Sequence, residues 1–160
     1  MNKNAEHTSE DHVHVEDHLT EELESGDTYS VATSFSIQDG STAYLALKTG
    51  ERLLHLSTIS VVGIFSWIEC KLCEAAKLEG GTVLTFQNRK RSRKNNSGCM
   101  IYAHSKINEL GTELDRMLVL SPGNRLEEII LKPNTQYLFV LVNKSGRNNY
   151  ANIRIQGHVD

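Results

Sequence analysis

The stretch "QYLFVLVNKSGRNNYANIRIQG", residues 136–157, decides the fold class. Residues 136–143 are apolar at almost every position, which is typical of a strand with both faces covered. Residues 150–157 alternate, so that Ala151, Ile153 and Ile155 would face inward and the side chains between them would face solvent. The intervening "KSGRNN" consists of turn-forming residues. We therefore predict two neighbouring antiparallel strands that close a sheet.

The segments nearer the amino terminus have the same character. "YSVATSFSI" (29–37), "TAYLALK" (42–48) and "RLLHLSTISVV" (52–62) are separated by the turn signals "QDGS" and "TGE". In the second of these, Ala43, Leu45 and Leu47 would lie on one side of a strand. Short strands with turn signals every 8 to 12 residues, roughly, are typical of a β-sandwich or barrel.

Residues 65–76, "FSWIECKLCEAA", are ambiguous from residue content alone. Glu, Lys, Leu and Ala favour a helix, and Ser66 with Glu69 resembles a capping box. A period of two is also present, with Ile68, Cys70 and Leu72 on one side. Both interpretations stay open at this level.

Charge is distributed unevenly along the chain. Residues 1–27 contain one cation, Lys3, and nine carboxylates, whereas the rest of the chain contains 16 cations and 11 carboxylates. The only helical signal near the start is "VEDHLTEELES", and it cannot bury enough surface alone to offset its ordering entropy. We predict a flexible acidic, His-rich arm (1–26) followed by one β-sandwich domain (27–160).

Motifs for metal binding and catalysis are weak. Cys70 and Cys73 have zinc or redox spacing, but a zinc site needs four convergent ligands, and on a strand these two thiols would face opposite ways. His12 and His14 lie on one side of an extended arm and could chelate a metal, yet the arm offers no fixed geometry. The sequence has no nucleophile elbow, phosphate loop or HExxH motif. We expect no cofactor, no metal and no enzymatic activity.

A basic cluster is the most distinctive polar feature: Arg89, Lys90, Arg91, Arg93 and Lys94. Phosphate contacts with nucleic acid are one interpretation, but the cluster has no aromatic side chains on which bases would stack. A nuclear localisation signal would look similar. The other interpretations are a solvated loop tip or contacts with acidic groups of a protein partner or of the same fold. We favour protein contact or solvation over nucleic acid.

Three segments in order resemble a family of small structural proteins of tailed bacteriophages. They are "GGTVLTFQNRKRSRKNNSG" (80–98), "CMIYAH" (99–104) and "ILKPNTQYLFVLVNKSGRNNYANIRI" (130–155). Residues 53–82 also look like the family's paired central strands, which favours a strand at 65–76. The resemblance implies an antiparallel β-sandwich of jelly-roll type. It also implies that Arg89 belongs to the fold, whereas the other four basic residues would meet an acidic capsid surface.

The resemblance leads to an expected function. It implies a virion structural protein that decorates or cements the outer capsid surface, with the major capsid protein as partner and a homotrimer as the favoured state. The odd number of cysteines and the absence of a signal-peptide pattern suggest assembly in the host cytoplasm, and no membrane segment is expected. A carbohydrate- or receptor-binding module is the first alternative, and would need exposed aromatics among Trp67, Tyr29, Tyr44, Tyr102 and Tyr150. A nucleic-acid-binding accessory protein using the basic cluster is the second.

Overall fold

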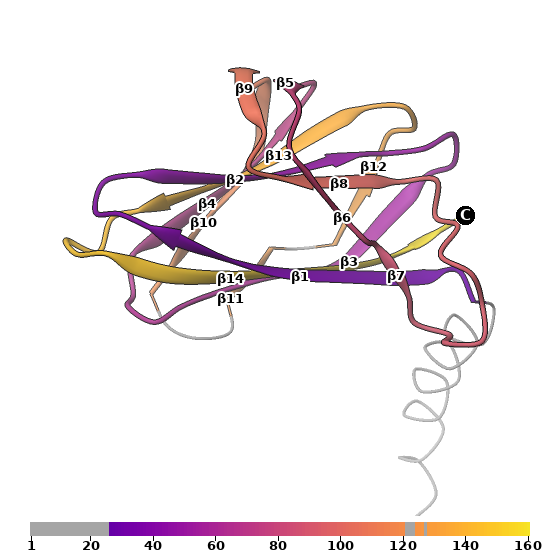
Figure 1. Ribbon diagram of the computed structural model, residues 1–160, viewed down its shortest axis with the longest axis horizontal. Helices are drawn as coiled ribbons and strands as arrows, with labels where there is room; N and C mark the ends of the chain where they lie inside the picture. The colour runs from indigo at the N-terminus through magenta and orange to yellow at the C-terminus, as the bar shows by residue number, and fades with distance from the viewer. Residues whose placement is uncertain (1–25, 121–123, 127) are drawn as a thin grey trace, which may run out of the picture.

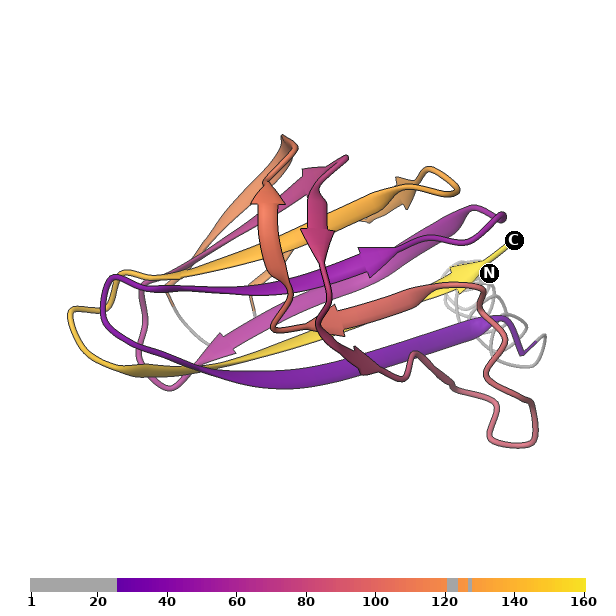
Figure 2. The same cartoon turned by 45° about the horizontal axis from the view of Figure 1, so that its top comes forward.

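The computed structural model describes residues 26–120, 124–126 and 128–160. These residues form two six-stranded antiparallel sheets and a separate two-stranded sheet (Figures 1 and 2). The predicted antiparallel β-sandwich is therefore confirmed. The predicted flexible arm lies outside the described residues except for Gly26. Within the described part of the chain, no helix is long and apolar enough to cross a membrane.

The first sheet is called the β1 sheet here. Strands from the two ends of the chain are neighbours in it. In order, they are β11 (Asn124–Leu126), β3 (Leu54–Gly63), β14 (Asn149–Val159), β1 (Thr28–Ile37) and β7 (Gln87–Asn88), with β12 (Ile129–Leu131) also paired to β3. The β2 sheet contains β10 (Thr112–Val119), β4 (Ile68–Glu74), β13 (Gln136–Asn143), β2 (Thr42–Lys48), β8 (Met100–Ala103) and β6 (Thr82–Leu84). The small sheet pairs β5 (Lys77–Glu79) with β9 (Lys106–Glu109).

The prediction that residues 136–157 form two neighbouring strands of one sheet is wrong. β13 pairs with β2 and β4, whereas β14 pairs with β1 and β3 in the other sheet. The connection 144–148 is therefore an arch across the end of the sandwich. Facing sheets are separated by about 10 Å, a gap that five residues can span, so turn chemistry alone does not distinguish an arch from a hairpin.

The main core fills the space between the two large sheets. Ala151, Ile153 and Ile155 of β14 are fully buried there, as their alternation predicts. Leu45 and Leu47 of β2 face the same core, and Ala43 packs against it. Burial of this apolar surface is the dominant force that holds the two sheets together.

Residues 68–74 form a strand, which resolves the helix-or-strand ambiguity of this segment. Ile68, Cys70 and Leu72 face the main core, while Cys73 faces the outer side of the β2 sheet. A second apolar cluster lies on that outer side: Ala46, Cys73, Ala76, Leu138 and Val140.

The β5–β9 pair covers part of this outer side. Leu78 of β5 and Ile107 of β9 pack against the second cluster, and Figure 1 shows both strands projecting beyond the large sheets. With apolar contacts on both faces, β13 is the doubly covered strand that its sequence predicts.

Candidate functional site

The predicted basic cluster lies in the connection between β7 and β8, which runs from the edge of the β1 sheet to the β2 sheet. Arg89, Arg91, Arg93 and Lys94 are exposed, and Lys90 is half-buried. Residues 89–98 are called the basic loop here. The basic cluster therefore belongs to a loop between two strands.

Asn88, a buried residue, organises this loop. Its side-chain Nδ2 donates to the carbonyl oxygen of Gly26 and its Oδ1 accepts from the Lys90 N–H at 2.8 Å. Its own backbone N–H donates to Asn95 Oδ1 at 2.6 Å. These bonds fold the loop back on itself and tie it to the start of β1. Asn88 is not among the site residues predicted from the sequence, although an asparagine next to a turn is a recognised signal for such bonding.

The basic residues differ in how they are held. The Arg89 N–H donates to the Thr28 carbonyl at 2.8 Å, which joins the loop to β1, while the Arg89 side chain is exposed. Arg91 Nη1 donates to Gln87 Oε1 at 3.1 Å. The Arg93 side chain lies against Gly26, where an added Cβ would be 3.0 Å from Arg93 Cγ. Arg89 thus contributes to the fold through its backbone N–H.

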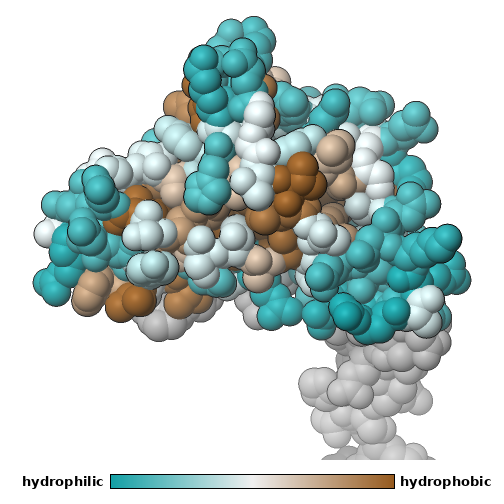
Figure 3. All heavy atoms as spheres, in the orientation of Figure 1, coloured by the Kyte–Doolittle hydropathy of each residue, from teal (hydrophilic) through white to brown (hydrophobic). Residues whose placement is uncertain are grey.

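A cleft of about 860 Å³ opens beside the basic loop, between the start of β1 and the β2–β3 turn. Its charged lining residues are four cations and two carboxylates: Lys48, Arg52, Arg93, Lys94, Asp27 and Glu51. Arg52 Nη1 lies 3.8 Å from Asp27 Oδ1. Figure 3 shows the hydrophilic surface at this end of the molecule. The excess of cationic groups makes the cleft suited to acidic ligands.

Apolar side chains gather at the opposite end of the sandwich. Ile64 is 71% exposed, Trp67 54% and Tyr150 56%, with Phe65 beside them. These four residues are called the apolar end. The pairing of Ile37 with Asn149, and of Thr28 with His158, shows that the apolar end and the cleft lie at opposite ends of β1 and β14. Exposed apolar residues that cluster in this way are typical of an interaction surface.

The backbone holds the apolar end in a fixed shape. Trp67 has a φ of 73°, and its N–H donates to Val119 O while its carbonyl accepts from the Lys144 N–H, both at 2.8 Å. Asn149, a buried residue, donates from Nδ2 to Phe65 O at 2.8 Å and accepts from the Phe65 N–H at 3.1 Å. A positive φ at a bulky residue is costly and persists only where surrounding contacts determine it. From the sequence, Trp67 and Tyr150 are candidates only for glycan platforms.

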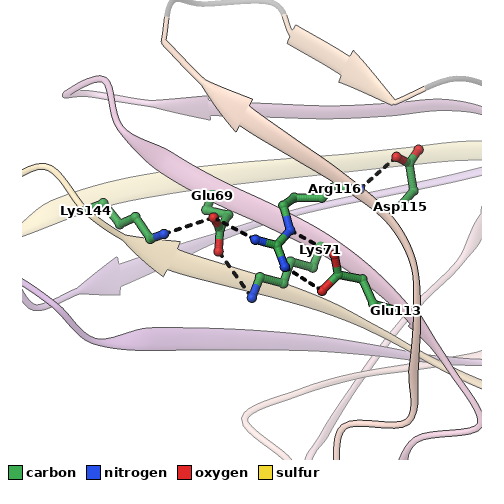
Figure 4. A network of polar contacts seen from close by, with 6 residues as sticks. All are labelled: Glu69, Lys71, Glu113, Asp115, Arg116 and Lys144. Carbon is green, nitrogen blue, oxygen red and sulfur yellow. Dashed lines mark hydrogen bonds and ion pairs between the residues drawn. The ribbon is translucent and has the colours of Figure 1, made fainter.

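A polar network covers the outer side of the β2 sheet near the apolar end (Figure 4). Glu69 Oε2 lies 2.9 Å from Lys144 Nζ, and Glu69 Oε1 lies 3.2 Å from Lys71 Nζ. Arg116 binds both Glu113 oxygens at 2.8 Å. The hydrogen bond from Lys144 is the main reason that the pKa of Glu69 is lowered, and the bonds from Arg116 lower the pKa of Glu113.

This network predicts acid sensitivity. Carboxylates with a lowered folded-state pKa stabilise the fold above the ordinary glutamate pKa of 4.5, and this contribution is lost as the pH falls through the lower folded-state value. The free energy of unfolding, measured by urea denaturation, should decrease from neutral pH to about pH 3. The decrease should be smaller in Glu69→Gln, because that variant has one fewer carboxylate to protonate. An equal decrease in the variant would show that Glu69 does not contribute.

All three cysteines are free thiols. Cys70 is buried in the main core, which raises the pKa of its thiol to about 12, and Cys73 faces the other side of the same strand. Burial also raises the pKa of the Cys99 thiol. The expectation that Cys70 and Cys73 would face opposite sides of a strand is confirmed. The proposed chelating pair His12 and His14 lies outside the described residues.

The aromatic side chains proposed as glycan platforms divide into three groups. Tyr29 is buried, so that candidate is excluded. Tyr44 and Tyr102 are half-buried beside the second apolar cluster. Trp67 and Tyr150 alone among the five are largely exposed. Neither of them lines the cationic cleft.

Comparison with known proteins adds no identification, since no family model and no curated protein matches this sequence.

Proposed function

We propose that this protein is a non-enzymatic virion structural protein that binds the outer capsid surface of a tailed bacteriophage and stabilises the head. The observation that carries the proposal is the presence of two different interaction surfaces at opposite ends of one sandwich. The apolar end has exposed Trp67 and Tyr150, and the lining of the cleft has more cations than carboxylates. A molecule of this kind suits bridging between neighbouring subunits of the major capsid protein.

The strand order supports the jelly-roll part of the proposal. β14 lies between β1 and β3 in one sheet, and β13 lies between β2 and β4 in the other. The first four strands of the chain alternate between the two sheets. Each of the last two strands lies between two of these four strands in its own sheet. A double-sheet jelly roll, built from two Greek keys, has long crossing connections of this type.

The bound protein would stabilise the capsid through thermodynamic linkage between its binding and the association of the coat subunits. Each bound copy that contacts two coat subunits adds its own binding free energy to the cost of separating them. The apolar end would supply most of the affinity, because aromatic anchors dominate binding energies. The basic loop, through Lys90, Arg91, Arg93 and Lys94, would meet acidic coat surfaces, and this contact should weaken as salt rises. A homotrimer is the favoured state, formed in the host cytoplasm and placed on the virion surface.

The first test is the composition of the virion and the binding of the purified protein to capsids that lack it. We expect a fixed, high copy number relative to the major capsid protein by quantitative mass spectrometry. The double variant Trp67→Ala and Tyr150→Ala should bind at least about tenfold more weakly, because it loses two aromatic anchors. Val83→Ala is the matched control, since Val83 is equally exposed but lies on β6, outside the apolar end. Absence from purified virions would contradict the proposal.

A carbohydrate-binding module is the second candidate, and the exposure of Trp67 and Tyr150 favours it. Aromatic faces of this kind stack on sugar rings. Binding to a glycan array that disappears in Trp67→Ala, together with unchanged capsid binding in the same variant, would support this candidate over capsid decoration.

A further inference from the structure

Three metal-ligating side chains meet on the outer face of the β1 sheet, at the end that carries the cationic cleft. They are His55 of β3, His158 of β14 and Asp160, which follows β14. His55 and His158 are direct cross-strand partners. The Asp160 N–H donates to the Leu53 carbonyl at 3.2 Å, which extends the ladder and places Asp160 on the same face as His158.

A β-bulge brings the two imidazoles together. The register of β3 and β14 shifts between Gln156 and Gly157, so that Ser57 is the extra residue. Gly157 approaches β3 so closely that an added Cβ would lie 2.3 Å from the His55 carbonyl oxygen. The resulting stack has ring centroids 4.5 Å apart and an interplanar angle of 28°. This local geometry fixes the positions of both rings.

The ligand atoms converge on a small volume. His55 Nε2 lies 2.7 Å from Asp160 Oδ2, and His158 Nε2 lies 3.6 Å from Asp160 Oδ1. One ligand atom from each of the three residues lies within 4.8 Å of the other two. His55 Nε2 is buried, and its 2.7 Å contact with Asp160 Oδ2 does not have the geometry of a hydrogen bond. A buried imidazole nitrogen without a hydrogen bond is unusual and requires an explanation.

We propose that His55, His158 and Asp160 bind a divalent transition-metal ion of the zinc class. Two imidazole nitrogens and one carboxylate oxygen are a common ligand set for zinc and neighbouring metals. Ligand atoms around tetrahedral zinc are about 3.3 Å apart, given bonds of about 2.0 Å, and the two distances above lie on either side of this value. Metal coordination would satisfy His55 Nε2 and hold both stacked rings in the neutral form. Three protein ligands leave a fourth position for water or a further group.

The experiment must separate this site from the histidines near the amino terminus. The sequence has four of them within residues 1–25: His7, His12, His14 and His18. Full-length protein is titrated with ZnCl₂ by isothermal calorimetry, and Co²⁺ is added in a parallel titration that is followed by its visible absorption. The variants are His55→Gln, His158→Gln and Asp160→Asn. The controls are the double variant His12→Gln and His14→Gln, and the single variant His104→Gln. Circular dichroism checks that each variant is folded.

We expect a saturable zinc site that His55→Gln and His158→Gln each weaken at least tenfold, with loss of the Co²⁺ absorption. Asp160→Asn should weaken it by a similar factor, and this exposed residue is the least disruptive of the three to replace. Both controls should retain the site and its absorption. Three outcomes would overturn the proposal: no saturable binding by the parent protein, binding unaffected by all three variants, or binding lost in the amino-terminal control.

Discussion

Replacing Asn143 with alanine is expected to destabilise the protein by about 3 kcal/mol, because several buried hydrogen bonds are lost together. For a chain of this length the change corresponds to a decrease of about 10 °C in the melting temperature. Asn143 is the last residue of β13, and its side chain is fully buried.

The size of the effect follows from what the Asn143 side chain connects. Its Nδ2 donates to Ile37 O at 2.9 Å and to Arg147 O at 2.7 Å, and its Oδ1 accepts from the Ser145 N–H at 3.0 Å. Ile37 ends β1, while Ser145 and Arg147 lie in the arch between β13 and β14. One side chain therefore joins two connections between the sheets. Alanine would leave these buried backbone groups without partners, which costs more than the loss of an exposed hydrogen bond.

Two further variants make the test specific. Asn143→Asp keeps the acceptor but loses the donor and places a negative charge beside carbonyl oxygens, so it should be at least as damaging as alanine. Asn152→Ala is the control, because Asn152 is exposed and the bond from its side chain to Ser34 Oγ, at 3.1 Å, lies on the surface. Urea denaturation followed by circular dichroism measures all three. A loss below about 1 kcal/mol in Asn143→Ala would show that the arch is held by other contacts.

The period-two pattern correctly predicted which side chains of the strands are buried, because successive residues of a strand point to opposite faces of the sheet. The alternation of Ala151, Ile153 and Ile155 and the doubly apolar β13 are both seen. Pairing was predicted less well. The stretch 144–148 has the residues of a hairpin turn, yet it is an arch, since the partners of β13 and β14 lie far away in the sequence. Local turn chemistry carries no information about those distant partners.

The candidate sites also differ in whether they depend on residues that are adjacent in the sequence or on residues that are far apart. The basic loop could be predicted because its charges are adjacent in the sequence. The cleft beside it could not, because it also needs the start of β1 and the β2–β3 turn, where Lys48 and Arg52 lie. His55 and His158 meet only through the pairing of β3 with β14, so no sequence spacing signals them. The stretch "GIFSW" (63–67) has an apolar pattern that fits a core segment equally well, and only the structure shows that it is exposed.

Replacing Asn88 with alanine should release the basic loop while the sandwich stays folded. The variant loses the side-chain bonds to Gly26 O, to Lys94 O and from the Lys90 N–H. We expect the free energy required to open the loop to decrease by about 2 kcal/mol. This is equivalent to about a thirtyfold increase in the population of the open loop. The loop lies at the edge of the β1 sheet and outside the main core, so opening it does not require global unfolding.

Trypsin is a suitable probe, because the loop itself supplies its cleavage sites at Arg89, Lys90, Arg91, Arg93 and Lys94. Cleavage within residues 89–94, mapped by mass spectrometry, should be roughly thirtyfold faster in Asn88→Ala. Hydrogen exchange of the Lys90 and Arg93 amides should increase in parallel, while the amides of β13 keep their protection. Asn96→Ala is the matched control, since Asn96 is an exposed asparagine of the same loop. Equal cleavage rates in the two variants would mean that Asn88 does not hold the loop. Faster exchange in β13 would mean that the loop and the core unfold as one unit, and that the cationic cleft is as rigid as the sandwich that carries it.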